Sequence, residues 1–301
     1  MIKSITVTNY RGDSIELVLA RPELSGFVIT SIEGLGPGKA TINTTEIATN
    51  DGSLFNSSRL PSRNIVISLK YLWKDTIEDV RQLSYKYFPI KQKLKLLVKT
   101  DNREATIEGY VESNEPQIFS ENETADISII CPNPFFYSSE VNNTVFSGIE
   151  PMFEFPFCND SLTENLLIMS EIYNYREMNI VYEGDAEIGV IITIHAIGEV
   201  GDITIYNTGT RETMTINTEK IASFTGSGIV AGDDIVISTV TGNKYVNLVR
   251  AGETTNIINC IDKNSSWFKL SKGDNVFAYV AEEGLNNIQF SVQNQIVYEG
   301  V

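Results

Sequence analysis

The stretch that most constrains this chain is Ile127 to Tyr137, ISIICPNPFFY. Its first half alternates between apolar and other positions, as a β-strand with one buried face does. The side chains expected on the buried face are Ile127, Ile129 and Cys131. Pro132 and Pro134 follow, and proline has no backbone N–H to donate to a neighbouring strand. We therefore expect the strand to stop at these prolines, and we interpret this point as the end of a first domain.

The length of the chain also indicates two domains. A chain of 301 residues exceeds what a single hydrophobic core usually organises, so we expect one domain over 1–136 and a second over 137–301. No apolar run approaches the roughly 20 residues that a membrane-spanning helix needs. The first residues alternate like a strand and lack the apolar segment of a secretory signal. These features predict a protein that is made in the cytoplasm and has no membrane contact.

The net charge of −16 is divided unequally between the two predicted domains. Residues 1–136 hold 15 Lys and Arg against 17 Asp and Glu, a net charge of −2, and residues 137–301 hold 8 against 22, a net charge of −14. The acidic second domain repels phosphate backbones, so we expect it to make no nucleic-acid contact. The nearly neutral first domain can meet copies of itself with little repulsion.

The first domain reads as mainly β with one helix. The expected strands are Ile2–Val7, Ile15–Leu19, Phe27–Glu33, Thr41–Ile47, Asn64–Trp73 and Ala105–Glu112. Apolar residues at helical spacing predict a helix over Asp75–Phe88, which Pro89 ends and which covers one sheet face. Alternating lysines in Lys91–Lys99 either guard the edge of a sheet or meet acidic groups on a neighbouring subunit. We expect a β-sandwich or barrel-like domain.

The second domain shows short, closely spaced strand patterns separated by turn signals, which is typical of a β-sandwich or jelly roll. The expected strands are Asn179–Tyr182, Val190–His195, Asp202–Asn207, Thr213–Ile216, Asp234–Thr239, Lys244–Leu248, Trp267–Leu270, Val276–Tyr279 and Asn287–Ile296. Before them, the FEFPF segment around Pro156 is interpreted as the crossing into this domain. The whole chain is thus predicted to be mainly β.

No group of residues predicts a catalytic, cofactor-binding or metal-binding site. His195 is the only histidine and lies within an apolar strand pattern, so a triad with a histidine base or a histidine-rich metal site has no basis. Cys131, Cys158 and Cys260 are widely spaced and odd in number, which favours buried thiols over disulfides or zinc ligands. Carboxylates are plentiful, but the surrounding sequence marks no two of them as the catalytic pair of a glycoside hydrolase. We expect no enzyme activity and no cofactor.

Several short segments, taken in order, resemble phage distal tail proteins. They are Gly34–Gly38, Asp51-Gly52, Arg63-Asn64-Ile65, Asp75–Phe88, Lys91–Tyr110, the CPNPFF segment ending at Phe136, Ser266–Leu270 with Gly273-Asp274-Asn275, and Tyr298–Val301. The glycine-rich loop among them is not a phosphate-binding loop, because Glu33 and Ala40 stand where such a loop needs Gly and Ser or Thr.

This resemblance implies a structural protein of the siphophage tail tip. The first domain would form a hexameric ring and the second would project outward as a β-sandwich similar to galectins and carbohydrate-binding modules. The implied partners are the tail tube protein, the tail-associated hub or lysin protein and receptor-binding proteins, and the implied location is the virion. The alternative is a glycan-binding module acting at a cell surface, in which one of the adjacent residues Trp267 and Phe268 would stack on a sugar.

Overall fold

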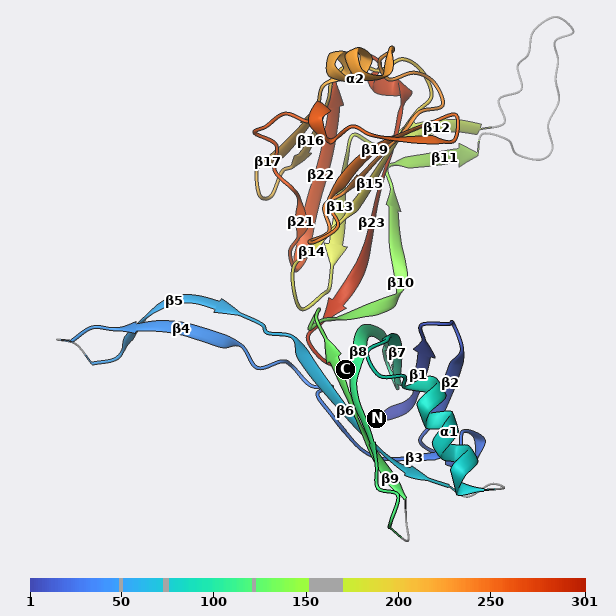
Figure 1. Cartoon of the computed structure of the whole chain (residues 1–301). Helices are drawn as coiled ribbons and strands as arrows, with labels where there is room; N and C mark the ends of the chain where they lie inside the picture. The colour runs from blue at the N-terminus through green and yellow to red at the C-terminus, as the bar shows by residue number, and fades with distance from the viewer. Residues whose placement is uncertain (49–50, 73–75, 121–122, 152–169) are drawn as a thin grey trace, which may run out of the picture. The chain divides into compact units, whose positions relative to one another are not determined.

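The computed structural model describes residues 1–48, 51–72, 76–120, 123–151 and 170–301. It divides into two units (Figure 1). Unit 1 consists of Met1–Glu140 and Val297–Val301, and unit 2 consists of Val141–Ile296. The chain therefore leaves unit 1 once and returns to it with its final five residues. The predicted division at 136 and 137 placed Val297–Val301 in the second domain, and here the structure differs, because this segment packs with unit 1.

Unit 1 is built on an antiparallel sheet in the order β2-β1-β7-β8-β9-β6-β3. Its strands are β1 Ile2–Asn9, β2 Ser14–Val18, β3 Phe27–Glu33, β6 Arg63–Tyr71, β7 Lys93–Thr100, β8 Glu104–Pro116 and β9 Thr124–Cys131. The first half of the long strand β8 pairs with β7 and its second half pairs with β9, so β8 joins the two halves of the sheet. A short 3-10 helix, Pro22–Leu24, connects β2 to β3.

The core of unit 1 follows the alternation in the sequence. In β6 the side chains of Ile65, Ile67 and Leu69 are fully buried, and in β9 those of Ile127 and Ile129 are fully buried. Helix α1, Ile77–Tyr87, contacts β1 and β6. The Thr76 side chain caps its first turn by accepting a hydrogen bond from the Asp79 amide. The helix expected within Asp75–Phe88 and the buried face expected for Ile127, Ile129 and Cys131 are confirmed.

Unit 2 is a sandwich of two antiparallel sheets, in the orders β23-β15-β18-β19-β20 and β13-β22-β16-β17. The strands are β13 Glu177–Tyr182, β15 Ile191–Ala196, β16 Ile203–Asn207, β17 Glu212–Ile216, β18 Asp234–Ser238, β19 Tyr245–Arg250, β20 Glu253–Asn256, β22 Gly273–Ala281 and β23 Ile288–Tyr298. Tyr279 of β22 stacks on Phe290 of β23 with ring centroids 4.9 Å apart. These rings join the two sheets in one core.

Smaller elements complete the chain. Strand β10, Phe136–Val145, pairs with β8 at its beginning and lies beside β23. Two ribbons, β11 Ser147–Pro151 with β12 Ser170–Asn174 and β14 Ile188–Gly189 with β21 Lys269–Leu270, and one helix, α2 Thr218–Thr225, belong to unit 2. The fold class is confirmed as mainly β, with one helix in unit 1. Helix α2 was not expected, and the predicted crossing at FEFPF lies outside the described residues.

Candidate assembly surface

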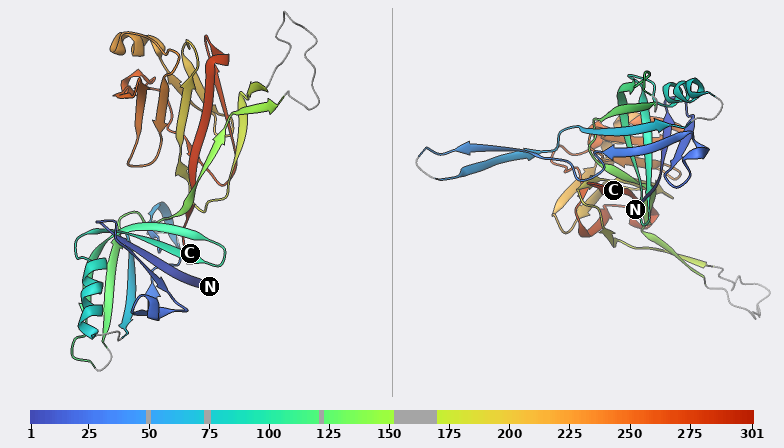
Figure 2. Two further views of the ribbon diagram at one scale, coloured as in Figure 1. Left: turned by 90° about the vertical axis from the view of Figure 1, so that its right-hand side faces the viewer. Right: turned by 90° about the horizontal axis from the view of Figure 1, so that it is seen from below.

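A two-stranded hairpin projects from unit 1. It consists of β4, Thr41–Glu46, and β5, Ser53–Arg59, and we call Thr41–Arg59 the arm. Every residue of these two strands is exposed. Figure 1 and the right-hand view of Figure 2 both show the arm extending away from the sheet of unit 1. A hairpin of two strands is marginally stable in water by itself, so an arm of this kind is suited to contact with another chain.

The arm exposes apolar side chains and hydrogen-bonding edges together. Ile42, Leu54 and Phe55 are each more than half exposed. The two strands pair only with each other among the described residues, so each keeps one edge of backbone N–H and C=O groups without a strand partner. Such an edge pairs readily with another strand. The side chains of Asn43 and Asn56 donate to Ser57 and Thr45 and so link the two strands of the hairpin.

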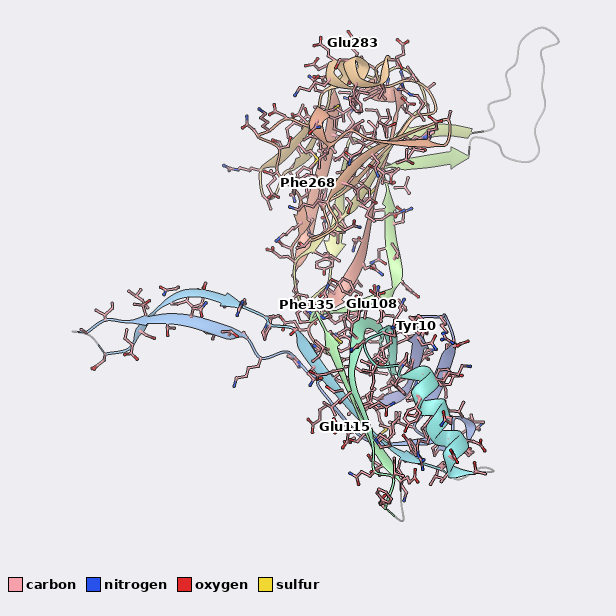
Figure 3. All side chains as sticks on the ribbon, viewed as in Figure 1. Tyr10, Glu108, Glu115, Phe135, Phe268 and Glu283 are labelled. Atoms are coloured by element: carbon pink, nitrogen blue, oxygen red, sulfur yellow. The ribbon has the colours of Figure 1, made fainter. Side chains whose placement is uncertain are left out.

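The lysines of β7 do not guard a sheet edge. Strand β7 lies between β1 and β8, so this interpretation of the alternating lysines was wrong. Lys93 Nζ lies 2.7 Å from Glu108 of β8, which is labelled in Figure 3. Lys99 Nζ lies 3.7 Å from Glu104 of the same strand. These lysines therefore find acidic partners within unit 1. The alternative, that lysines of Lys91–Lys99 meet acidic groups on a neighbouring subunit, stays a prediction.

His195 is a sheet residue, as the sequence predicted. It lies in β15 opposite Asp234 of β18, and its Nδ1 is 2.6 Å from the Asp234 carboxylate. Both side chains are about 40% exposed, and no serine or cysteine nucleophile is hydrogen-bonded to the ring among the described contacts. The pair therefore joins two strands on the outer side of a sheet.

The cysteines in the described part of the chain are buried and free. Cys131 and Cys260 are 0% and 4% exposed, and Cys158 lies outside the described residues. Burial raises the pKa of the Cys131 thiol to about 11, against the opposing effect of nearby Arg63, so the thiol stays protonated at neutral pH. Within the described ranges, no three His, Cys, Asp or Glu side chains are grouped so that they could hold a metal ion. No helix there is long and apolar enough to span a membrane.

The residues proposed for sugar stacking do not form an open aromatic platform. Phe268, which is labelled in Figure 3, is fully buried, and its ring packs against Phe277 in the core of unit 2. Trp267 is half-buried, and the Lys244 ammonium lies 5.1 Å from its ring centroid. A pocket of about 360 Å³ in unit 2 is lined by aliphatic, glycine and polar residues and by Glu199 and Glu283, with no aromatic ring. This arrangement offers little of the stacking surface that sugar recognition uses.

Sequence reasoning found the first strand of the arm and missed the second. Strand β4 lies within the predicted strand Thr41–Ile47. Strand β5 has the sequence SLFNSSR, whose small polar residues do not alternate with apolar ones. The available signal was the Asp51-Gly52 pair after β4, because Asp-Gly is typical of tight hairpin turns. Gly52 has a φ of +92°, a left-handed conformation that glycine adopts without strain.

Comparisons with known proteins find no matching family model and no matching curated protein. Solved structures do match. The Dit protein of phage SPP1, described as a paradigm of the hub adsorption apparatus in phages infecting Gram-positive bacteria, aligns with a TM-score of 0.66 and 11% identity over 97% of this chain and 98% of its own. A chain of the phage P2 baseplate, in its activated conformation with Ca, aligns with a TM-score of 0.48 and 12% identity over 98% of both chains. Across nearly its whole length, this chain has the fold of the SPP1 distal tail protein.

Proposed function

We propose that this chain is a structural component of a phage tail tip that assembles through unit 1 into a six-membered ring. The observation that carries the proposal is the exposed arm of unit 1, on a chain that shares its fold with SPP1 Dit from end to end. The number of subunits rests on the resemblance to distal tail proteins. The ring joins the tail tube to the tail-associated hub and the receptor-binding apparatus, so the chain works in the virion.

The arm suits the contact that a ring requires. When an arm on one copy binds the body of the next copy, the two surfaces in contact differ. Repetition of such a heterologous contact gives a closed ring when the rotation from one copy to the next brings the last copy back to the first. Burial of the Ile42 side chain in the neighbouring copy would stabilise the contact by about 2 kcal/mol, and burial of Phe55 would add about the same. The open strand edges of the arm would add backbone hydrogen bonds. Together these gains offset part of the loss of subunit freedom on association.

The charge division is compatible with assembly by unit 1. The nearly neutral residues 1–136 can pack closely, whereas copies of the strongly acidic residues 137–301 repel each other when crowded. Screening over about 8 Å at physiological salt weakens this repulsion without removing it at contact. We infer that unit 2 occupies the periphery. We further infer a structural role, because the fold is shared with SPP1 Dit, a protein described as part of a hub adsorption apparatus.

The arm can be tested with two substitutions. The double variant Ile42→Ser with Phe55→Ser removes apolar area without altering any buried residue, so folding should be unaffected. We expect the parent chain to sediment as a ring and the double variant to sediment as a monomer at the same concentration. Analytical ultracentrifugation measures the difference.

The matched control is Val181→Ser, which replaces an apolar residue of unit 2 that is 63% exposed. This variant should form the same oligomer as the parent chain. If the arm variant still forms rings, or if the control dissociates equally, the arm is not the assembly surface. A parent chain that is monomeric at all concentrations and binds sugars on a glycan array would favour the cell-surface glycan-binding alternative.

A further inference from the structure

Arg63 lies where the arm returns to unit 1. It is the first residue of β6 and is only 7% exposed. Its Nε donates to the Pro134 carbonyl at 2.7 Å, Nη1 donates to the carbonyls of Gly34 at 2.7 Å and Gly36 at 2.5 Å, and Nη2 donates to the Glu299 carbonyl at 2.6 Å. One guanidinium thus holds three segments that are far apart in the sequence. Its planar fork of donors suits this task, and a lysine could not reproduce it.

The segment after β23 lies against the loop 34–38. The Val301 amide donates to the Leu35 carbonyl at 3.1 Å, and Leu35 is 7% exposed. Gly300 packs closely on the same loop, since a Cβ built on it would lie 2.9 Å from the Pro37 nitrogen. Glu299–Val301 therefore contacts the loop through one backbone hydrogen bond and close packing. We call these three residues the clamp.

The loop 34–38 leads from β3 into the arm, and Arg63 begins β6 just after the arm ends. We call these two connections the roots of the arm. The two roots lie close together, because a Cβ on Gly34 would lie 2.1 Å from the Asn64 carbonyl oxygen, and Gly34 has a φ of +84°. Three of the five residues in the loop are glycines, so the loop has little stiffness of its own. The strands of the arm, being exposed throughout, supply no buried contact that would fix its direction.

We propose that the clamp sets the direction of the arm by closing its root around Arg63. With the clamp in place, the carbonyls of Gly34, Leu35 and Gly36 are all hydrogen-bonded and the root is rigid. Without it, Arg63 loses the Glu299 acceptor, the Leu35 carbonyl loses the Val301 amide, and the glycine-rich root becomes a hinge. The proposal deepens the proposed function, because a fixed direction is what lets the arm reach a neighbouring copy.

Amide hydrogen exchange on the intact chain, at a concentration where it is monomeric, tests the clamp without reference to any ring. Deletion of residues 299–301 should accelerate exchange of the non-proline amides in 34–40 by at least about tenfold and leave the amides of β9 unchanged. Gly300→Ala should act in the same direction through one added methyl group. The control is Val181→Ser, which changes an exposed residue of unit 2 and should exchange like the parent chain at the arm root.

The outcomes separate the clamp from the proposed function. Unchanged exchange at the root in both clamp variants, or equal acceleration throughout unit 1, would overturn the proposal. Sedimentation then measures assembly, and the clamp variants should lose the oligomer that Val181→Ser retains. Local loosening with full assembly would refute the link between clamp and ring. Should the parent chain itself fail to assemble, the proposed function fails, while the exchange result still decides whether the clamp fixes the arm.

Discussion

At the scale of single residues, the ion pair of Asp233 and Arg250 shows how unit 2 tolerates a buried charge. Asp233 is 1% exposed and receives two hydrogen bonds from Arg250, at 2.8 Å from Nε and 2.6 Å from Nη2. Burial by itself would raise the pKa of Asp233, but the hydrogen bonds from Arg250 and from the Val230 amide outweigh it, and its pKa lies below the usual value. Arg250 also donates to Ser227 and to the Gly228 carbonyl, which holds that loop in place.

Replacement of this arginine should destabilise unit 2 in a pH-dependent way. Arg250→Met leaves the Asp233 carboxylate buried without its partner, and we expect a loss of about 3 kcal/mol in the free energy of unfolding at pH 7. In the parent chain the lowered pKa of Asp233 contributes stability that is present above the unfolded-state pKa and lost as the pH falls through the folded-state pKa. The stability of the variant instead rises as the pH falls, because protonation of Asp233 removes a buried negative charge that has lost its partner. The difference in stability should therefore shrink as the pH falls from 7 towards 3, first through the raised pKa of Asp233 in the variant and then through its lowered pKa in the parent chain.

Urea unfolding of the parent chain and the variant between pH 7 and pH 3 measures this difference. Lys272→Met is the control, since Lys272 is 72% exposed and lies 4.0 Å from Asp185, and exposed pairs contribute little. A stability difference for Arg250→Met that stays constant over the pH range would show that Asp233 is not its cause.

At the scale of elements, the sequence predicts well where one face is buried. Helix α1, β6 and β9 were predicted because their apolar residues recur at the spacing of a helix or a strand. Helix α2 was missed because eight residues give a short pattern, although Asn217 at its N-cap and Gly226 in a left-handed C-cap were available signals. Strand β5 was missed because neither of its faces is buried. Hydrophobic pattern cannot reveal an element that buries nothing in its own chain.

The arm should accordingly be dispensable for folding. Replacement of Thr41–Arg59 with a short Gly-Ser turn, keeping the loop 34–38 and Arg63, removes only exposed strands. We expect the free energy of unfolding to change by less than about 1 kcal/mol, since nothing is taken from the core. Urea denaturation followed by tryptophan fluorescence and circular dichroism measures it. A chain that aggregates or unfolds after the replacement would indicate that the arm is part of the fold of unit 1.

At the scale of the whole molecule, the sequence predicted two β-rich parts and placed the end of the first domain at the prolines of CPNPFF. Strand β9 ends at Cys131, and unit 1 continues through Glu140. The return of Val297–Val301 could not be predicted, because it depends on pairings such as Arg63 with Glu299, which are 236 positions apart. Local sequence patterns do not indicate which residues so far apart come into contact. The resemblance to distal tail proteins anticipated the fold, although the order of its short segments did not show that several of them meet at Arg63.

The central claim, a ring built from unit 1, is tested most directly by negative-stain images of the purified chain with the mass of the particles measured in parallel. A ring of six copies of the 33.5 kDa chain has a mass of about 200 kDa. We predict particles of that mass, with a central hole and six-fold symmetry. Monomers at all concentrations, or closed dimers with two-fold symmetry, would contradict the account.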